Sequence, residues 1–201
     1  KQPDKPITSN LVNSVHAMGE LCWFGQDASL DLDSFTTNWT RRTKQVLQLV
    51  DNVGPIAFRE ERPFVGGLQG FSYLFKLPNV WIYVPLSVLP SDKVTSILPV
   101  DDGLWVGLSS DGLRFVGMNF STMTVTGIDA YRAADGLAGD GVQAIARDKG
   151  GRLWVGTSEG LSLRGGGYWL NFTPANSPLA DSAIRALSVD GGGRLWIGTA
   201  A

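Results

Sequence analysis

Short segments in which apolar and polar residues alternate recur along the chain, and each is followed by a turn rich in aspartate and glycine. This alternation has the period of two that is typical of a half-buried β-strand, and it is clearest at 94–98, 142–146 and 184–188. Glycine supplies positive φ angles and aspartate accepts hydrogen bonds from nearby amides, so the links that follow are predicted hairpin turns, at 101–103, 148–151 and 190–193. Each hairpin leads into a second apolar segment, which predicts paired antiparallel strands.

The second apolar segment is a repeated phrase, Leu-Trp-Val/Ile-Gly, found at 104–107, 153–156 and 195–198. Weaker copies stand at 22–25 and 63–66. The aromatic position of the phrase advances in steps of 41, 41, 49 and 42 residues, through Trp23, Phe64, Trp105, Trp154 and Trp196. A period of about 40 to 50 residues indicates propeller blades or helical arrays, and strand-rich units with glycine turns decide for the propeller.

Two further strands complete each predicted unit. Residues 111–115 and 159–163 are interpreted as a turn and third strand, and a second aromatic series indicates a fourth strand, at Trp39, Trp81, Phe120 and Trp169. A four-stranded antiparallel unit of this kind is a propeller blade, which packs face to face on its neighbours. The sequence therefore predicts a single all-β propeller over residues 1–201, with blades at about 7–45, 46–90, 91–135, 136–180 and 181–201.

The repeat resembles that of a known family. The phrase Asp-x-x-Gly-x-Leu-Trp-Val/Ile-Gly-Thr, preceded by a Val/Ile-x-x-Ile strand and followed by Gly-Leu, is similar to the two-component-regulator propeller repeat. The linkers at 134–137 and 176–179 resemble its inter-blade phrase. The resemblance is good from about Val94 to Thr199 and poor before that. It implies a β-propeller in the extracytoplasmic sensor part of bacterial hybrid histidine kinases or in related exported proteins, and hence a periplasmic or extracellular location.

The last predicted unit has only two strands before the chain stops at Ala201. Residues 1–10 are long enough for one further strand at about 3.3 Å per residue, so two strand positions stay unpaired and leave an exposed edge. We therefore expect this chain to be part of a larger, six- to eight-bladed propeller, or to be completed by a partner chain.

Composition excludes several classes of function. The net charge of −2 offers no basic field for nucleic acid, and no apolar stretch approaches the roughly 20 residues that a membrane helix needs. Residues 1–6 show no apolar signal region, so either export is absent or a signal has been removed. One cysteine, Cys22, and one histidine, His16, exclude an internal disulfide and most zinc or histidine-based chemistry. No cofactor, metal or catalytic residue is predicted.

Candidate ligand contacts come from loops at one end of the blades, where strand one begins and strand two ends. Antiparallel order brings these loops together, and loops carry function in many folds. They offer acidic, amide and hydroxyl side chains, namely Gln26, Asp27, Gln69, Asp92, Ser109, Ser110, Asp111, Asp140, Ser158, Glu159 and Asp181. Such a ring suits a sugar, a cation or a peptide, and the alternative is that these residues only solvate loops and form turns.

Other conspicuous residues have structural interpretations. The aromatic residues of the repeated phrase are assigned to the core, because they recur at strand centres, although an aromatic face also suits a sugar ring. His16 and Cys22 are interpreted as structural. Gly165-Gly166-Gly167 lacks the lysine and helix of a phosphate loop and is set aside.

Three functions stay open, because propellers host binding, scaffolding and catalysis alike. The first is a non-catalytic sensing or ligand-recognition module, for a saccharide or another small molecule, with the setting that the resemblance implies. The second is a structural or protein-interaction propeller in a larger assembly. The third is a propeller enzyme of the polysaccharide lyase or lactonase type, which a single histidine disfavours.

Overall fold

The structure is a computed structural model that describes residues 12–18, 21–26, 29–34, 40–43, 54–60, 62–68, 70–75, 80–83, 89 and 92–201. Side chains are described for 54–60, 62–68, 70–73, 89 and 92–201. The chain divides into two compact units, residues 1–97 and 98–201. The described residues are almost entirely β-strand and turn, with one short 3₁₀ helix at Ala133–Asp135.

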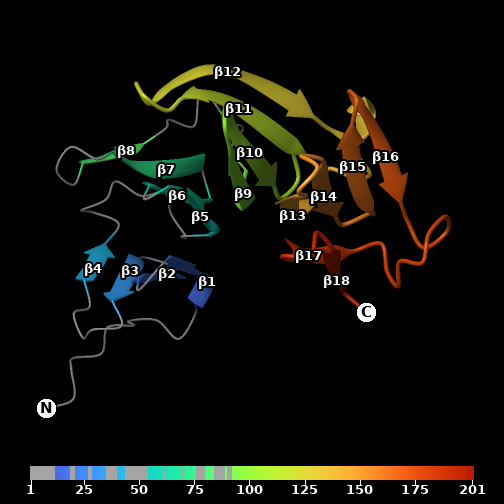
Figure 1. Ribbon diagram of the computed structural model, residues 1–201, viewed down its shortest axis with the longest axis horizontal. Coiled ribbons are helices and arrows are strands. Elements are labelled where there is room, and N and C mark those ends of the chain that lie inside the picture. Colours follow the sequence, from blue (N-terminus) through green and yellow to red (C-terminus); the bar gives the residue numbers. More distant parts are fainter. Residues whose placement is uncertain are drawn as a thin grey trace, which may run out of the picture. The chain divides into compact units, whose positions relative to one another are not determined.

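The first unit contains two four-stranded antiparallel sheets, in which each strand pairs with the next along the chain (Figure 1). One consists of β1 (Val12–Met18), β2 (Leu21–Gln26), β3 (Ser29–Ser34) and β4 (Thr40–Thr43). The other consists of β5 (Ile56–Arg59), β6 (Arg62–Gly67), β7 (Gly70–Phe75) and β8 (Val80–Tyr83). Phe64, at the centre of β6, is fully buried, and its ring lies 5.9 Å from that of Tyr73 on β7.

The remaining sheets follow the same strand order. One consists of β9 (Val94–Val100), β10 (Gly103–Leu108), β11 (Leu113–Asn119) and β12 (Thr124–Tyr131). The next consists of β13 (Val142–Arg147), β14 (Leu153–Thr157), β15 (Leu161–Gly165) and β16 (Tyr168–Phe172). The last pairs β17 (Ile184–Val189) with β18 (Leu195–Thr199). The prediction of four-stranded antiparallel blades is confirmed, whereas the exact blade boundaries stay predictions.

Both faces of β10, the second strand of the third blade, are covered. On β10, Leu104 and Val106 are fully buried while Trp105, which points to the opposite face, is half-buried. Trp105 packs against an apolar cluster that joins two adjacent sheets and consists of Leu113, Leu137, Val142, Leu153 and Val155. Fourth strands are more exposed, and β12 has no fully buried residue. The aliphatic neighbours of the tryptophan are therefore buried more deeply than the tryptophan itself.

The expectation that Phe120 belongs to a fourth strand is wrong. Phe120 lies in the turn between β11 and β12 rather than in a fourth strand, because the side chain of Asn119 accepts the amide hydrogens of Ser121 and Thr122 and forms the hairpin there. Trp196 is 60% exposed in the two-stranded β17–β18 sheet, and its assignment to the core stays a prediction. The side chains of Trp23, Trp39 and Trp81 lie outside the described side chains.

A repeated Asp–Arg–Trp contact closes the hairpin between strands one and two. Asp148 accepts hydrogen bonds from the Arg152 side chain at 2.7 Å and from the Trp154 indole at 3.1 Å. Asp190 repeats both contacts with Arg194 and Trp196, at 2.8 and 3.0 Å. The positive φ predicted for the turn glycines is present at Gly151 and Gly193 but not at Gly103, whose tight approach to the Val116 carbonyl leaves no space for a Cβ atom. The aspartate and tryptophan of the family phrase therefore form one hydrogen-bonded unit.

These hydrogen bonds give the Asp190 carboxyl group an acidic pKa. The backbone amide of Arg194, the Trp196 indole and the Arg194 side chain all donate to the ionised form and lower its pKa from 3.8 to about 2. Because the folded pKa lies below the unfolded one, the associated stabilisation is present above about pH 4 and is lost as the pH falls towards 2.

We expect Trp196→Phe to raise the pKa of Asp190 towards 3.8, because the substitution removes one donor and keeps the aromatic ring. A carbon-13 NMR titration of the Asp190 carboxyl group measures the change. Tyr168→Phe, which alters an exposed ring on β16, is the control and should leave that pKa unchanged. An unchanged pKa in Trp196→Phe would mean that the indole does not contribute.

Candidate functional site

The candidate contacts predicted from the sequence fall at the expected ends of the strands where they are described. Gln26 is the last residue of β2, and Asp92 precedes β9 and accepts the amide hydrogen of Lys93 at 2.7 Å. Asp181 precedes β17 and accepts the amide hydrogen of Ala183 at 3.0 Å. Asp27 and Gln69 lie outside the described residues. The carboxylates of Asp92 and Asp181 thus serve local turns.

Asp111 is the centre of an ion-pair cluster at this end of the third blade. Its two carboxylate oxygens contact Arg114 at 2.5 Å and Arg132 at 2.7 Å. Burial lowers the pKa of the Arg114 guanidinium, and the neighbouring Asp111 acts in the opposite direction and raises it. A buried cation needs such a partner, so the Asp111 carboxylate stabilises the end of β11.

Asp140, another candidate at this end, connects the third and fourth blades. The Asp140 side chain accepts the amide hydrogen of Ala133 at 2.7 Å, and its backbone carbonyl accepts that of Gly112 at 2.8 Å. The Ser158 amide donates to the Gly141 carbonyl at 2.9 Å. Ser109 and Ser110 follow β10, and Glu159 has an exposed side chain. The structure therefore brings Ser109, Asp111, Asp140, Ser158 and Glu159 to one end of these two blades, where several of them form structural contacts.

An open cleft of about 850 Å³ lies at the opposite end of the same two blades. Three hairpins form its rim: 101–102 between β9 and β10, 150–152 between β13 and β14, and 165–167 between β15 and β16. Gly166 and Gly167 have positive φ angles, which lets the last of these hairpins turn tightly. The glycine run set aside as a phosphate loop is thus a hairpin on the edge of the cleft.

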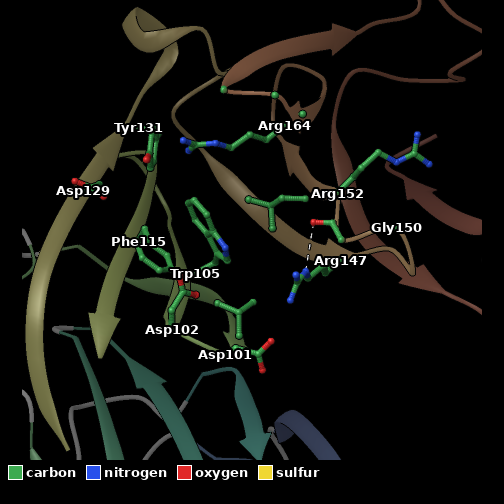
Figure 2. Close-up of a pocket in the computed structure, with 16 residues that line it drawn as sticks. Asp101, Asp102, Trp105, Phe115, Asp129, Tyr131, Arg147, Gly150, Arg152 and Arg164 are labelled. Atoms are coloured by element: carbon green, nitrogen blue, oxygen red, sulfur yellow. Dashed lines mark hydrogen bonds between the residues drawn. The ribbon is translucent and has the colours of Figure 1, made fainter. Parts of the chain in front are cut away.

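The wall of the cleft is an aromatic cluster around one arginine, shown in Figure 2. The guanidinium carbon of Arg164, from β15, lies 4.1 Å from the centre of the Tyr131 ring. It lies 5.4 Å from the rings of both Trp105 and Trp169. Phe115 extends the wall, with its ring centre 4.8 Å from that of Trp105. Aromatic faces attract a guanidinium ion, so the third and fourth blades together fix the position of this side chain.

Acidic and basic side chains are balanced around the cleft. The acidic ones, Asp101, Asp102 and Asp129, are exposed, and the basic ones are Arg147, Arg152 and Arg164. Arg152 is paired with Asp148, and Arg147 donates to the Gly151 carbonyl at 3.3 Å. Nη1 of Arg164 is buried and has no hydrogen-bond acceptor among the described residues. The cleft is therefore lined by aromatic surface, carboxylate acceptors and the Arg164 side chain, whose Nη1 atom is itself buried.

Sequence reasoning missed Tyr131, Arg147 and Arg164. None of the three belongs to the repeated phrase, and Tyr131 and Arg164 meet only because two blades pack together. Gly165 to Gly167 was the one local signal, since it marks the hairpin that follows Arg164.

The described residues contain neither a candidate metal-binding cluster nor a candidate membrane-spanning helix. Within the described ranges, no cluster of three or more His, Cys, Asp or Glu side chains could hold a metal ion. The part of the chain that the structure describes contains no helix suited in length and hydropathy to crossing a membrane.

Known structures define the fold class as a β-propeller. The extracellular domain of a protein described as a one-component system, BT4673 from B. thetaiotaomicron, superposes on 99% of this chain with a TM-score of 0.78 and 18% identity. The extracellular domain of the hybrid two-component system BT3049 from the same organism covers 99%, with a TM-score of 0.78 and 20% identity. In each case the chain spans only 27% of the other protein.

A third similar structure is PorZ of Porphyromonas gingivalis, a bacterial surface component of the type-IX secretion system. It covers 94% of this chain, with a TM-score of 0.73 and 16% identity, and the chain spans 31% of it. The model of the two-component regulator propeller family matches residues 136–159 and 178–201. Two segments of the chain are therefore similar to repeats of the two-component regulator propeller family. No curated protein matches the sequence significantly.

Proposed function

We propose that this chain is a non-catalytic ligand-recognition module of an extracytoplasmic bacterial sensor. The cleft between the third and fourth blades is the observation that carries the proposal, because it combines an open volume with aromatic, acidic and basic side chains. Small-molecule binding sites are concave and combine apolar or aromatic surface with polar groups that orient the ligand. The similarity to extracellular domains of one-component and hybrid two-component systems supports the setting.

We assign ligand recognition to the end of the blades that carries the β9–β10, β13–β14 and β15–β16 hairpins. The sequence favoured the opposite end, where strand one begins and strand two ends. At the latter, Asp111 and Asp140 are already engaged within the protein. At the cleft, Asp101 and Asp102 have exposed side chains and line the open volume. Exposed carboxylates accept hydrogen bonds from ligand hydroxyl groups, and the Trp105 ring offers an apolar surface beside them.

A screen of neutral and acidic saccharides and other small metabolites against the whole chain, read by thermal shift, tests this function. We expect compounds that bind to be recovered chemically unchanged by mass spectrometry, because recognition without turnover leaves the ligand intact. We expect Asp102→Asn to weaken the binding of a neutral saccharide about tenfold, because it removes a charged acceptor of ligand hydroxyl groups from the cleft. The matched control, Glu159→Gln at the other end of the blades, should bind as the unaltered chain does.

Three results would contradict the proposal in different ways. Loss of binding in Glu159→Gln but not in Asp102→Asn would place the ligand at the end predicted from the sequence. Conversion of a bound compound would show an enzyme. A screen without any bound compound would overturn ligand recognition and favour the second candidate.

The second candidate is a protein-interaction propeller, which exposed apolar side chains favour. Tyr168 and Leu170 on β16 are 67% and 49% exposed. Exposed apolar surface of this kind often marks a contact with another chain. Stoichiometric co-purification of a partner that is lost in a Tyr168→Ser and Leu170→Ser double variant would support this candidate.

A further inference from the structure

We propose that the cleft binds a carboxylate, which pairs with the guanidinium group of Arg164. The inference rests on the proposed recognition function and names the chemistry of its ligand. It starts from the only described side chain of the cleft that combines a fixed position, a positive charge and a buried donor without an acceptor.

The surroundings of Arg164 fix its guanidinium group before any ligand arrives. The side chain leaves β15 opposite Trp169 of β16 and lies between the rings of Trp105, Tyr131 and Trp169. The Tyr131 and Trp169 rings meet edge to face at 5.9 Å, so the cage itself is packed. A long side chain held in this way loses little further rotamer freedom on binding, which favours affinity.

The hydrogen bonding of Arg164 is incomplete. The carboxylates of the described chain form ion pairs with Arg114, Arg132, Arg152 and Arg194, and none pairs with Arg164. A buried cationic donor without an acceptor is costly, and the aromatic rings offer it no hydrogen-bond acceptor of ordinary strength. The planar fork of arginine matches the two oxygens of a carboxylate, which would pair with the part of the guanidinium group that lines the cleft.

Among anions, the charges around the cleft favour a monovalent acid over a divalent one. Arg147 lines the same cleft and adds a second cation. Asp101, Asp102 and Asp129 also line it and would repel a dianionic phosphate more strongly than a monoanion. The wall formed by Trp105 and Phe115 then meets the apolar surface of the ligand, which either a sugar acid or an aromatic acid can offer.

Isothermal titration of the whole chain with paired probes tests the proposal and separates these two sources. The pairs are D-glucuronate with D-glucose and benzoate with benzamide, and in each pair the acid carries a carboxylate that its neutral counterpart lacks. We expect at least one acid to bind about tenfold or more tightly than its neutral partner, since charge-assisted hydrogen bonds are the strong ones. The pair that shows this difference identifies the source of the carboxylate.

Variants assign the difference to Arg164. We expect Arg164→Gln to reduce the affinity for the acid to about that of the neutral partner, and Arg164→Lys, which keeps the charge but not the fork, to recover part of it. Arg194→Gln is the matched control, because Arg194 also lies over a tryptophan ring, that of Trp196, but is not among the residues that line the cleft. It should bind the acid unchanged.

Equal binding of acid and neutral partner, or unchanged acid binding in Arg164→Gln, would overturn the carboxylate while leaving recognition at the cleft intact. Absence of acid binding in a chain that binds other compounds of the screen has the same meaning. If Arg164→Gln fails to fold, two other measurements test the carboxylate proposal. They are the comparison of acid with neutral probe in the unaltered chain and the acid binding of Arg147→Gln. An Arg147→Gln variant that binds the acid unchanged would then count against the proposal.

Discussion

Gly112→Ala is expected to destabilise the chain by about 3 kcal/mol or more, which makes it one of the two most damaging substitutions that we predict. Gly112 has a φ of +78°, a region that costs an alanine roughly 1–2 kcal/mol. An added Cβ atom would also lie 2.3 Å from the Tyr131 carbonyl oxygen, which is backbone and cannot move away cheaply. The Gly112 amide donates to the Asp140 carbonyl, so the displacement would also disturb the link to the next blade.

Gly167→Ala separates the two causes. Gly167 has a φ of +88°, and no atom lies within 4 Å of a Cβ atom built there. We expect it to cost about 1 kcal/mol, the conformational contribution alone. Urea unfolding of both variants, followed by tryptophan fluorescence, measures the difference. Similar losses in the two variants would show that the contact with the Tyr131 carbonyl does not matter.

Leu113→Ala is expected to lower the free energy of unfolding by about 3 kcal/mol, within the range of roughly 2–5 for a leucine truncated in a core. Leu113 is fully buried in the cluster that joins the third and fourth blades. The same cluster includes Leu153 and Val155 of the next blade, so we expect the cavity to open between blades rather than within one. Urea unfolding measures the loss, and amide exchange at β13 and β14 shows whether the neighbouring blade is loosened.

Leu170→Ala is the matched control for this prediction. Leu170 belongs to the outermost strand of its sheet and is 49% exposed. A surface truncation of this kind usually changes stability by about 0.5 kcal/mol or less. If both leucines cost the same, the cluster around Leu113 would not be the part of the core that holds the two blades together.

The relation between sequence and fold is closest where the physics is local. Alternating apolar residues favour a strand, Asp-Gly links favour a hairpin, and their recurrence from Trp23 to Trp196 reports a repeated unit. The Asp190–Trp196 hydrogen bond shows why the phrase keeps its spacing, since both partners belong to one hairpin. Contacts between residues so close along the chain leave a pattern that a single sequence displays.

The periodic sequence pattern alone did not predict the position of Phe120 or the exposure of Trp196. Phe120 continues the aromatic period, yet the Asn119 turn places it outside a strand. Trp196 repeats the environment of Trp154 along the chain but not in space, since Trp154 is half-buried and Trp196 is mostly exposed. Exposure depends on what lies against a face, which the period alone does not specify.

The candidate site also combines features set by residues close in sequence with features set by the packing of blades. The sequence by itself determined the class of fold, the hairpins and the two ends of the blades at which loops gather, because each follows from residues near one another along the chain. Only the tertiary structure decided which end opens into a cleft, because Trp105 and Tyr131 of one sheet enclose Arg164 of the next. Those side chains come from different repeats, and their meeting depends on how the blades pack.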